Sequence, residues 1–380
     1  MSRILSRIAD YIRETDKLLM SLCLFASLFG AAMVLSTTHY TGSLRAFFVQ
    51  IGAIAIGVAA AIVVSILVDY HTILKWWPIY MGIALAAVML TFVIGYAPTG
   101  TDDKAWLLLP GGMSLQPSEL LKIAFIITFA KHVSAIDEEV ISFKNVILLC
   151  IHGAAPVVLI HIQGDDGTAL VLAVIFIGML FAAGVRLRYF ALAGLLAAIS
   201  APILWFVVMN DDQQERIRIL FNPESDLYGG GWQQWRARIA MANGGFWGRG
   251  YLKGEFVQSN SVPMGHNDFM FASIGEELGM FGLMVIMLLF VAIGIRILVV
   301  AHKARDKAGV IICTGIFSML AIQVILNIGM CVSVLPVIGI TLPFFSAGGT
   351  SLVATYLGIG LVINVYMHRA NQVMYLNDEF

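Results

Sequence analysis

The sequence predicts an all-α integral membrane protein with ten transmembrane helices, and three observations support this fold class. Hydrophobic residues make up 59% of the chain and charged residues only 12%, whereas soluble domains carry about 25% charged residues. Apolar runs long enough to cross a bilayer, about 20 residues each, recur along the whole sequence. The polar segments between them are short, except for one extracytoplasmic loop expected at about residues 210–267. A chain of this composition cannot cover itself with polar surface and must be embedded in lipid.

The expected spans follow one another without a soluble domain or a low-complexity linker. They cover about residues 18–38, 47–68, 76–96, 118–134, 144–162, 168–185, 189–209, 269–299, 309–334 and 351–368. The eighth is long enough for a short first helical segment before Glu276-Glu277, or for a strong tilt. Residues 1–17 form a charged segment, an interfacial amphipathic helix or a charged tail, and residues 369–380 form a tail. The membrane domain is therefore one unit, residues 18–368.

The distribution of Lys and Arg predicts the orientation, because cytoplasmic connections of membrane proteins carry an excess of both. With the amino terminus inside, the short outer connections hold only Arg45 and Lys104. The inner segments hold Arg3, Arg7, Arg13, Lys17, Lys75, Lys144, Arg186, Arg188, Lys303, Arg305, Lys307 and Arg369. Both ends are thus expected in the cytoplasm and the 210–267 loop outside. A net charge of −1 without a basic stripe gives no support for a nucleic-acid partner.

Unusual sequence is concentrated in four segments on the predicted outer side. They are residues 96–117, 163–167, 210–267 and 335–349, each rich in Gly, Pro, Asp or Trp. In the last, two prolines and three glycines leave backbone groups free at membrane depth. Such backbone is tolerated only where protein or a wet cavity covers it. Any chemistry is therefore expected on the outer side, in a polar cavity that Gln323 and Asn327 are spaced to line.

Glu119 and Lys122 are the first candidate catalytic residues. Pro117 favours the first helical position, so a helix is expected to begin here with both side chains on one face. In a soluble protein the acid would simply complement the helix dipole and pair with the lysine. Within a membrane span, an ionisable pair is costly and usually faces a cavity. The sequence therefore favours a functional pair.

Asp268 is the candidate on which the interpretation depends. It stands just before an apolar helical run, where an aspartate is either an N-cap or a catalytic group at the membrane surface. His266 beside it is more often a hydrogen-bonded neighbour than a ligand. Glu276 and Glu277 follow about two turns later, and acids so close to lipid indicate a polar cavity.

Three further features of the outer side each have two interpretations. Asp165, in the Gln-Gly-Asp-Asp-Gly-Thr segment 163–168, is typical of a structural turn and is a weak metal signal. Arg216 and Arg218 suit phosphate oxygens or form a solvated face. Trp232 can stack on a sugar ring or anchor the loop at the headgroup level.

Together these segments resemble the SEDS family (shape, elongation, division and sporulation), the RodA and FtsW proteins. Residues 116–122 match its Q-P-S-E-x-x-K motif, and residues 231–233, 243–250, 266–272, 276–279 and 336–351 resemble its other motifs in order. Three places depart from the family pattern: Gly164 replaces a proline, Ala347 replaces a tyrosine, and Lys104-Ala105-Trp106 replaces an Arg-Arg-Trp or Arg-Trp. The charged segment at residues 1–17 is short, which favours a RodA-like member.

The resemblance implies a peptidoglycan glycosyltransferase in the bacterial cytoplasmic membrane that polymerises lipid II on the outer face. Asp268 would be the general base, Glu119 would orient Lys122, and Lys122 would face the pyrophosphate leaving group. The implied substrate-binding residues are Gln116, Ser118, Asp165, Arg216, Arg218, Trp232, Gln233, His266, Ser346, Gly348 and Gly349. The implied partners are lipid II, membrane lipid and a class B penicillin-binding protein. The only cofactor left open is a divalent cation, Mg or Mn, with Asp268 as a candidate ligand.

Two other functions remain open from the sequence. A lipid II flippase would also use a charged cavity in the membrane, although Asp268 at the outer surface suits a base better than a translocation site. A non-catalytic scaffold for the crosslinking enzyme would keep its function without Asp268.

Overall fold

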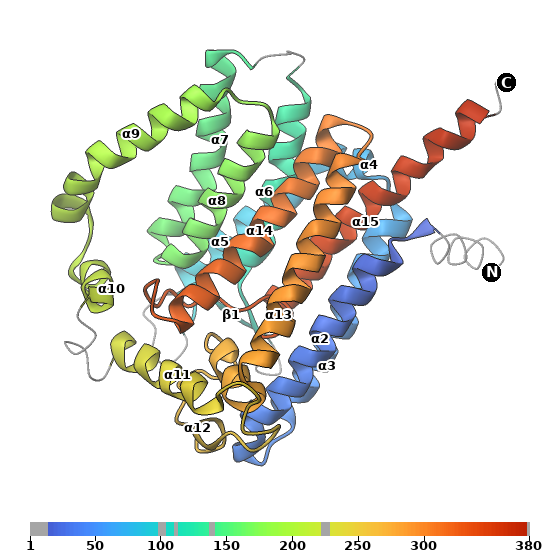
Figure 1. Ribbon diagram of the computed structural model, residues 1–380. Helices are drawn as coiled ribbons and strands as arrows, with labels where there is room; N and C mark the ends of the chain where they lie inside the picture. Colours follow the sequence, from blue (N-terminus) through green and yellow to red (C-terminus); the bar gives the residue numbers. More distant parts are fainter. Residues whose placement is uncertain (1–13, 98–103, 110–112, 137–140, 222–228, 378–380) are drawn as a thin grey trace.

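The computed structural model is a bundle of long helices (Figure 1), and it describes residues 14–97, 104–109, 113–136, 141–221 and 229–377. Its long helices are α2 (Lys17–Thr38), α3 (Arg45–Leu67), α5 (Trp77–Ile94), α6 (Pro117–Ser134), α7 (Phe143–Ile162), α8 (Asp166–Ala182), α9 (Leu187–Ile203), α13 (Met270–His302), α14 (Lys307–Cys331) and α15 (Gly349–Asn377). Each expected span therefore contains a helix. The amphipathic helix considered for residues 1–17 lies almost entirely outside the described residues.

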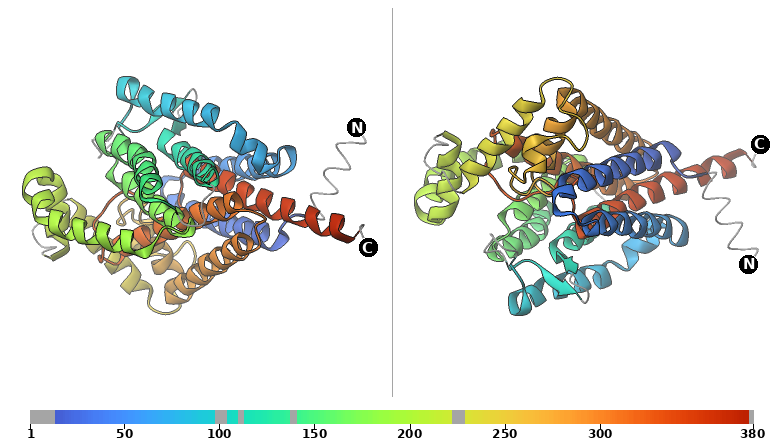
Figure 2. Two further views of the ribbon diagram at one scale, coloured as in Figure 1. Left: turned by 90° about the horizontal axis from the view of Figure 1, so that it is seen from above. Right: turned by 90° about the horizontal axis from the view of Figure 1, so that it is seen from below.

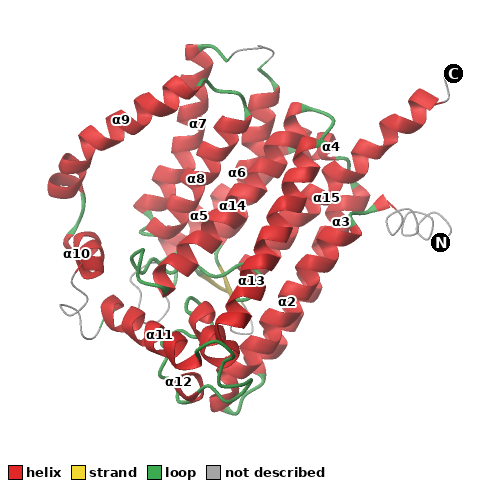
Figure 3. Ribbon diagram, viewed as in Figure 1, coloured by secondary structure: helices red, strands yellow, loops and turns green. Residues whose placement is uncertain are grey.

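Shorter elements connect the long helices, and Figure 3 shows that nearly all of the described chain is helix or loop. They are η1 (His39–Thr41), α4 (Tyr70–Lys75), η2 (Leu204–Val208), α10 (Asp211–Phe221), α11 (Gly230–Gly244) and α12 (Glu255–Gln258). The strands β1 (Leu107–Leu109) and β2 (Met113–Leu115) form one antiparallel pair. The predicted 210–267 loop is thus partly helical. The predicted tail from residue 369 continues α15 as helix to Asn377.

Eight helices of the described chain are long and apolar enough to cross a membrane, namely α2, α3, α5, α7, α9, α13, α14 and α15. This confirms an all-helical, multi-pass membrane protein. The two other predicted spans are α6, which carries Glu119 and Lys122, and α8, which has only 17 residues. Helix α6 packs against α5, α7, α8, α14 and α15. Since most of its residues are buried by protein, α6 tolerates charges that a lipid-facing helix would not.

Parts of the segments predicted on the outer side lie at the lower end of the bundle in Figure 1. Helices α11 and α12 and strand β1 lie at this end, and the view from below in Figure 2 shows α11 and α12 across it. Helix α4 and the α13–α14 turn lie at the opposite end, together with the start of α2 and the end of α15. The placement of these segments on the outer side of a membrane stays a prediction.

Helix α13 is broken at Gly279, whose φ of 66° is outside the helical region. A Cβ at this position would lie 2.4 Å from the Gly248 nitrogen, so the site requires glycine. Beyond the break, the N–H groups of Met280 and Phe281 donate to the carbonyls of Gly245 (2.9 Å) and Phe246 (3.0 Å). The short first segment considered for this span thus exists, and it ends just after Glu276-Glu277.

Glu276 and Glu277 hold the preceding segment against α13. Both are fully buried, and protein groups satisfy their carboxylates. The donors are Asn243 Nδ2 (2.9 Å) and the N–H groups of Phe256 (2.9 Å) and Val257 (2.8 Å) for Glu276, and Ser36 Oγ (2.6 Å) and Gln258 Nε2 (3.0 Å) for Glu277. The expectation that these acids open on a polar cavity is therefore wrong. Glu276 instead binds the first amides of α12.

Candidate active site

Asp268 lies in the turn that leads into α13, and its main chain is fixed by α14. Asn327 donates from Nδ2 to the carbonyl of Asp268 (2.8 Å) and to the carbonyl of Ile340 (2.7 Å). One fully buried amide thus joins the start of α13 to the 335–349 loop. The prediction that Asn327 lines the same space as this loop is confirmed.

A second connection runs through residues 266 and 267. Ser346 Oγ donates to the carbonyl of Asn267 (2.6 Å), and the N–H of Ala347 donates to the carbonyl of His266 (2.8 Å). Ser346 Oγ also accepts from the N–H of Leu342 (2.8 Å), which fixes the turn of the 335–349 loop. The structure therefore brings two predicted residues, His266 and Ser346, next to Asp268.

The carboxylate of Asp268 does not cap α13. The N-cap is Phe269, which makes no side-chain capping bond. Within the described part of the chain, no donor or cation contacts the Asp268 carboxylate, and a Cβ on Gly339 would lie 3.8 Å from its Oδ2. Burial raises the pKa of Asp268 to about 6. A carboxylate of this kind is well suited to take a proton near neutral pH.

His266 and Gly265 line a narrow pocket together with Thr37 and Ser273, and this pocket has no room for a water molecule. Burial lowers the pKa of His266, so this ring is neutral near pH 7 and adds no positive charge beside Asp268. Nearby on α14, the amide oxygens of Gln323 and Asn327 are buried without a hydrogen-bond partner in the described chain.

Glu119 and Lys122 form the predicted ion pair at the start of α6. Lys122 Nζ lies 2.8 Å from Glu119 Oε2, and the two side chains are only 1% and 8% exposed. Pro117 occupies the first turn and Gln116 is the N-cap, as proline's fixed φ favours. Because both charged groups are buried, removing either one would leave the other as an unpaired charge in the protein interior.

Asp165 connects α6 to α8. Its Oδ1 accepts from the N–H of Thr168 (2.9 Å), which caps α8, and its Oδ2 accepts from Gln116 Nε2 (2.9 Å) and Ser118 Oγ (3.5 Å). This agrees with the structural-turn interpretation of residues 163–168 and joins three predicted residues. Two residues after Asp165, Gly167 is so close to the Ile338 carbonyl that a Cβ would lie 2.5 Å from it. Contacts thus run from α6 through this turn to the 335–349 loop and on to Asp268.

Arg218, a cationic candidate on α10, has no acid partner among the described residues. It is exposed, donates to Gln214 Oε1 (3.0 Å), and lies over Trp205, with 5.9 Å to the ring centroid. The side chain of Arg216 lies outside the described residues.

The candidates on α11 and α15 have other surroundings. Trp232 is half-buried beneath Arg236 (5.5 Å to the ring centroid), and Gln233 is half-buried. Gln234, next to Gln233, is not singled out by any local pattern, and it donates to the carbonyls of Met330 (3.0 Å) and Leu335 (2.7 Å). Gly349 begins α15, and the carbonyl of Gly348, which precedes the helix, accepts from the N–H of Leu352 (2.9 Å).

The described residues provide no preformed metal cage. No group of three or more His, Cys, Asp or Glu side chains in the described ranges could hold one metal ion. Mg²⁺ is commonly held by one or two carboxylates with substrate phosphates and water. A cation at Asp268 would thus take most of its ligands from the substrate.

Comparisons with known proteins agree on one family. The family model FtsW/RodA/SpoVE, described as cell cycle protein, matches residues 14–371. Peptidoglycan glycosyltransferase MrdB of Escherichia coli K12 is 33% identical over 320 residues, covering 84% of this chain and 85% of that protein. The probable peptidoglycan glycosyltransferase FtsW of Geobacter metallireducens is 34% identical over 369 residues, covering 93% and 95%.

Solved structures share the fold. One is a chain from a study of a peptidoglycan synthase complex that coordinates polymerization and crosslinking, with a TM-score of 0.78, 26% identity, and coverage of 93% of this chain and 98% of that one. Another is the rod shape determining protein RodA of Thermus thermophilus, with a TM-score of 0.69, 23% identity, and coverage of 93% and 97%.

Proposed function

The chain belongs to the FtsW/RodA/SpoVE family and is a peptidoglycan glycosyltransferase, and we propose that it polymerises lipid II with Asp268 as the general base. The observation that supports this most strongly is the state of Asp268. Its main chain is fixed by Asn327, while its carboxylate has no donor in the described chain and a pKa raised to about 6 by burial. A structural carboxylate would be hydrogen-bonded, as those of Glu276 and Glu277 are.

The reaction joins two lipid-linked disaccharides. The 4-hydroxyl of one sugar attacks the anomeric carbon of the other, and its proton passes to a carboxylate oxygen of Asp268. A carbon–oxygen bond forms at the anomeric carbon as the bond to the undecaprenyl pyrophosphate breaks. Negative charge then grows on the pyrophosphate oxygens, where cations stabilise the transition state.

Lys122, Arg216 and Arg218 are the proposed cations for the pyrophosphate. Lys122 is held in one position by Glu119, at 2.8 Å, and a preorganised charge needs no reorganisation during the reaction. The two arginines lie on α10, and their guanidinium groups suit phosphate oxygens. Gln116, Ser118, Asp165, Trp232, Gln233, His266, Ser346, Gly348 and Gly349 are proposed to bind the rest of the substrate.

The proposed topology has ten spans, with α6 and α8 completing the eight apolar ones. Both run alongside spanning neighbours, α6 beside α5 and α14, and α8 beside α7 and α14. The termini would then face the cytoplasm and the Asp268 end would face outward from the bacterial cytoplasmic membrane. A class B penicillin-binding protein is the proposed partner, because one similar chain comes from a complex that couples polymerization to crosslinking.

The proposal is tested with the purified protein and fluorescent lipid II in detergent. Detergent abolishes the two sides of a membrane, so glycan polymer can form only through catalysis and not through lipid transport. Polymer resolved on a gel supports the glycosyltransferase. Absence of polymer, alone and with the cognate penicillin-binding protein, while the same sample moves lipid II across vesicles, would support a flippase.

The pH dependence of the reaction follows from the pKa of Asp268. Since the base must be unprotonated and its pKa is about 6, kcat/KM is expected to fall about tenfold for each pH unit below 6. Above about pH 7 the rate should reach a plateau. Initial polymerisation rates at subsaturating lipid II, measured from pH 5 to 8, check this. A rate that stays constant from pH 5 to 7, in protein shown to remain folded, would contradict the role of Asp268.

A further inference from the structure

A second polar site lies at the end of the bundle opposite Asp268. A cavity of about 290 Å³ opens between α4, the carboxyl end of α6 and the start of α14. Lys75, Lys131 and Lys307, one from each of these helices, line it together with Ser134. The proposed reaction uses none of these residues.

The three lysines have no acidic partner in the chain as described. None of their ammonium groups lies within 4.0 Å of a carboxylate there. Lys131 and Lys307 are half-buried and Lys75 is exposed. Three like charges facing one cavity repel one another, so an anion between them would be stabilising.

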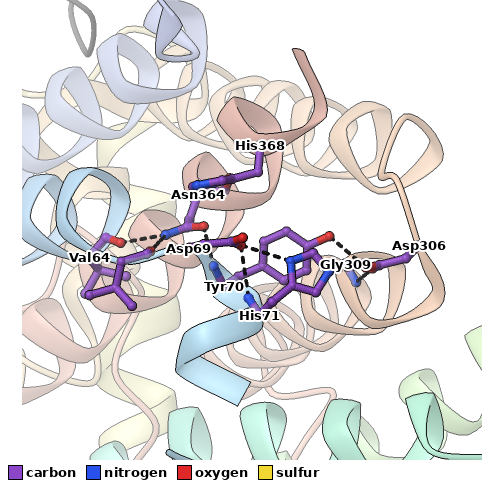
Figure 4. A network of polar contacts seen from close by, with 9 residues as sticks. Val64, Asp69, Tyr70, His71, Asp306, Gly309, Asn364 and His368 are labelled. Atoms are coloured by element: carbon purple, nitrogen blue, oxygen red, sulfur yellow. Dashed lines mark hydrogen bonds and ion pairs between the residues drawn. The ribbon is translucent and has the colours of Figure 1, made fainter. Parts of the chain in front are cut away.

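Asp306, which also lines the cavity, is engaged elsewhere. Its Oδ1 accepts from the N–H of Gly309 (2.8 Å) and caps α14, while its Oδ2 accepts from the hydroxyl of Tyr70 (2.9 Å) and faces His71 Nε2 at 2.5 Å (Figure 4). Burial would raise the pKa of Asp306, but these hydrogen bonds outweigh it and hold the pKa below its usual value.

His71 balances Asp306 and Asp69. Its Nδ1 lies 3.0 Å from Asp69 Oδ1, and its Nε2 faces Asp306. Both carboxylates thus have a partner other than the lysines of the cavity. Three lysines against the two carboxylates of Asp69 and Asp306 leave an excess of positive charge at the site.

The cavity lies at the depth of lipid headgroups. Trp76 and Trp77 directly follow Lys75 and are 54% and 41% exposed. Tryptophan gathers where the hydrocarbon core meets the headgroups, so Lys75 is placed at that level. Basic pockets between transmembrane helices on the cytoplasmic side are suited to anionic headgroups.

We propose that this cavity binds the phosphate of an anionic membrane lipid. The lysines supply the charge, and the lipid tails extend along the adjoining helices. Free phosphate shares the headgroup chemistry, but it has no tails to hold it at this depth.

The proposal is tested by native mass spectrometry of the full-length protein, titrated with phosphatidylglycerol or with phosphatidylcholine in neutral detergent. The test variant changes Lys75, Lys131 and Lys307 to Gln. The control variant changes Lys17, Lys144 and Lys303 to Gln, which removes three exposed charges of the same predicted side. Each lysine near an anionic lipid is worth about fivefold in affinity, so the test variant should lose on the order of 100-fold and the control only a few-fold.

Several results would overturn the proposal. They are equal loss in both variants, equal binding of the two lipids, and phosphate ions that bind as tightly as phosphatidylglycerol in thermal-shift titrations. Asp137, Glu138 and Glu139 follow in the sequence and lie outside the described residues. If the protein binds lipid only after these three acids are replaced by amides, the proposal would also be overturned, because the acids would then be the partners of the lysines. Thermal unfolding in phosphatidylcholine confirms that each variant is folded.

Discussion

Changing Asp268 to Asn is expected to reduce lipid II polymerisation by about 10²–10⁴-fold, the usual contribution of a general base. Asn fills the same space and keeps the main-chain contact with Asn327, so only proton transfer should be lost. The measurement is the initial polymerisation rate of purified protein in detergent. Glu255→Gln is the matched control, since Glu255 is an exposed acid at the same end of the bundle, and its rate should stay within about twofold of the unaltered protein.

The same variant should be more stable above pH 6. Burial raises the pKa of Asp268 to about 6, above the value of about 3.9 in an unfolded chain. The protonated form therefore favours folding at low pH, and this contribution is lost as the pH rises through 6. Asn cannot ionise and avoids this loss. The free energy of unfolding of Asp268→Asn should therefore exceed that of the unaltered protein by about 1–3 kcal/mol at pH 7.5 and equal it below pH 4. A variant that unfolds instead would indicate a structural role, and one that still polymerises would indicate a scaffold.

Changing Glu119 to Gln is expected to destabilise the protein by about 3–5 kcal/mol, because Lys122 would be left as an unpaired buried charge. Lys122 is only 1% exposed, and Glu119 is its sole ion-pair partner in the described chain. Thermal unfolding in detergent and the yield of monodisperse protein measure the effect. Asp211→Asn, at an exposed acid on α10, is the control and should change stability by less than about 0.5 kcal/mol.

A double variant separates stability from catalysis. Glu119→Gln with Lys122→Met removes both charges, and replacing a buried ion pair by apolar groups is often neutral. The double variant should therefore regain most of the lost stability. If this stable double variant polymerises lipid II about 10²-fold or more slowly than the unaltered protein, Lys122 acts on the reaction. Full activity in the stable double variant would leave the pair a structural role only.

Features set by local spacing were predicted correctly from the sequence. Glu119 and Lys122 lie three residues apart in a helix that begins at Pro117, and helical geometry alone brings them together. The proline- and glycine-rich 335–349 loop, with Asn327 at helical spacing before it, was correctly expected to share one region. The long apolar runs correctly predicted the long helices. The total of ten spans stays a prediction, because α6 is surrounded by protein and its own hydropathy is low.

Features that depend on distant partners were missed. The sequence shows Glu276 and Glu277 at the edge of an apolar run, but not that their donors lie 19 to 33 residues earlier on α11 and α12, or on α2. The contacts of Gln234 with the carbonyls of Met330 and Leu335 span about a hundred residues, and no local pattern marks them. Long-range hydrogen bonds to main-chain groups leave no periodic signal.

The turn before α13 is held by carbonyl oxygens, those of His266, Asn267 and Asp268. Every amino acid has the same main-chain carbonyl oxygen, so these hydrogen bonds do not depend on which side chains occupy positions 266 and 267. Substitutions at positions 266 and 267 should therefore leave these main-chain contacts, and with them the place of Asp268, unchanged.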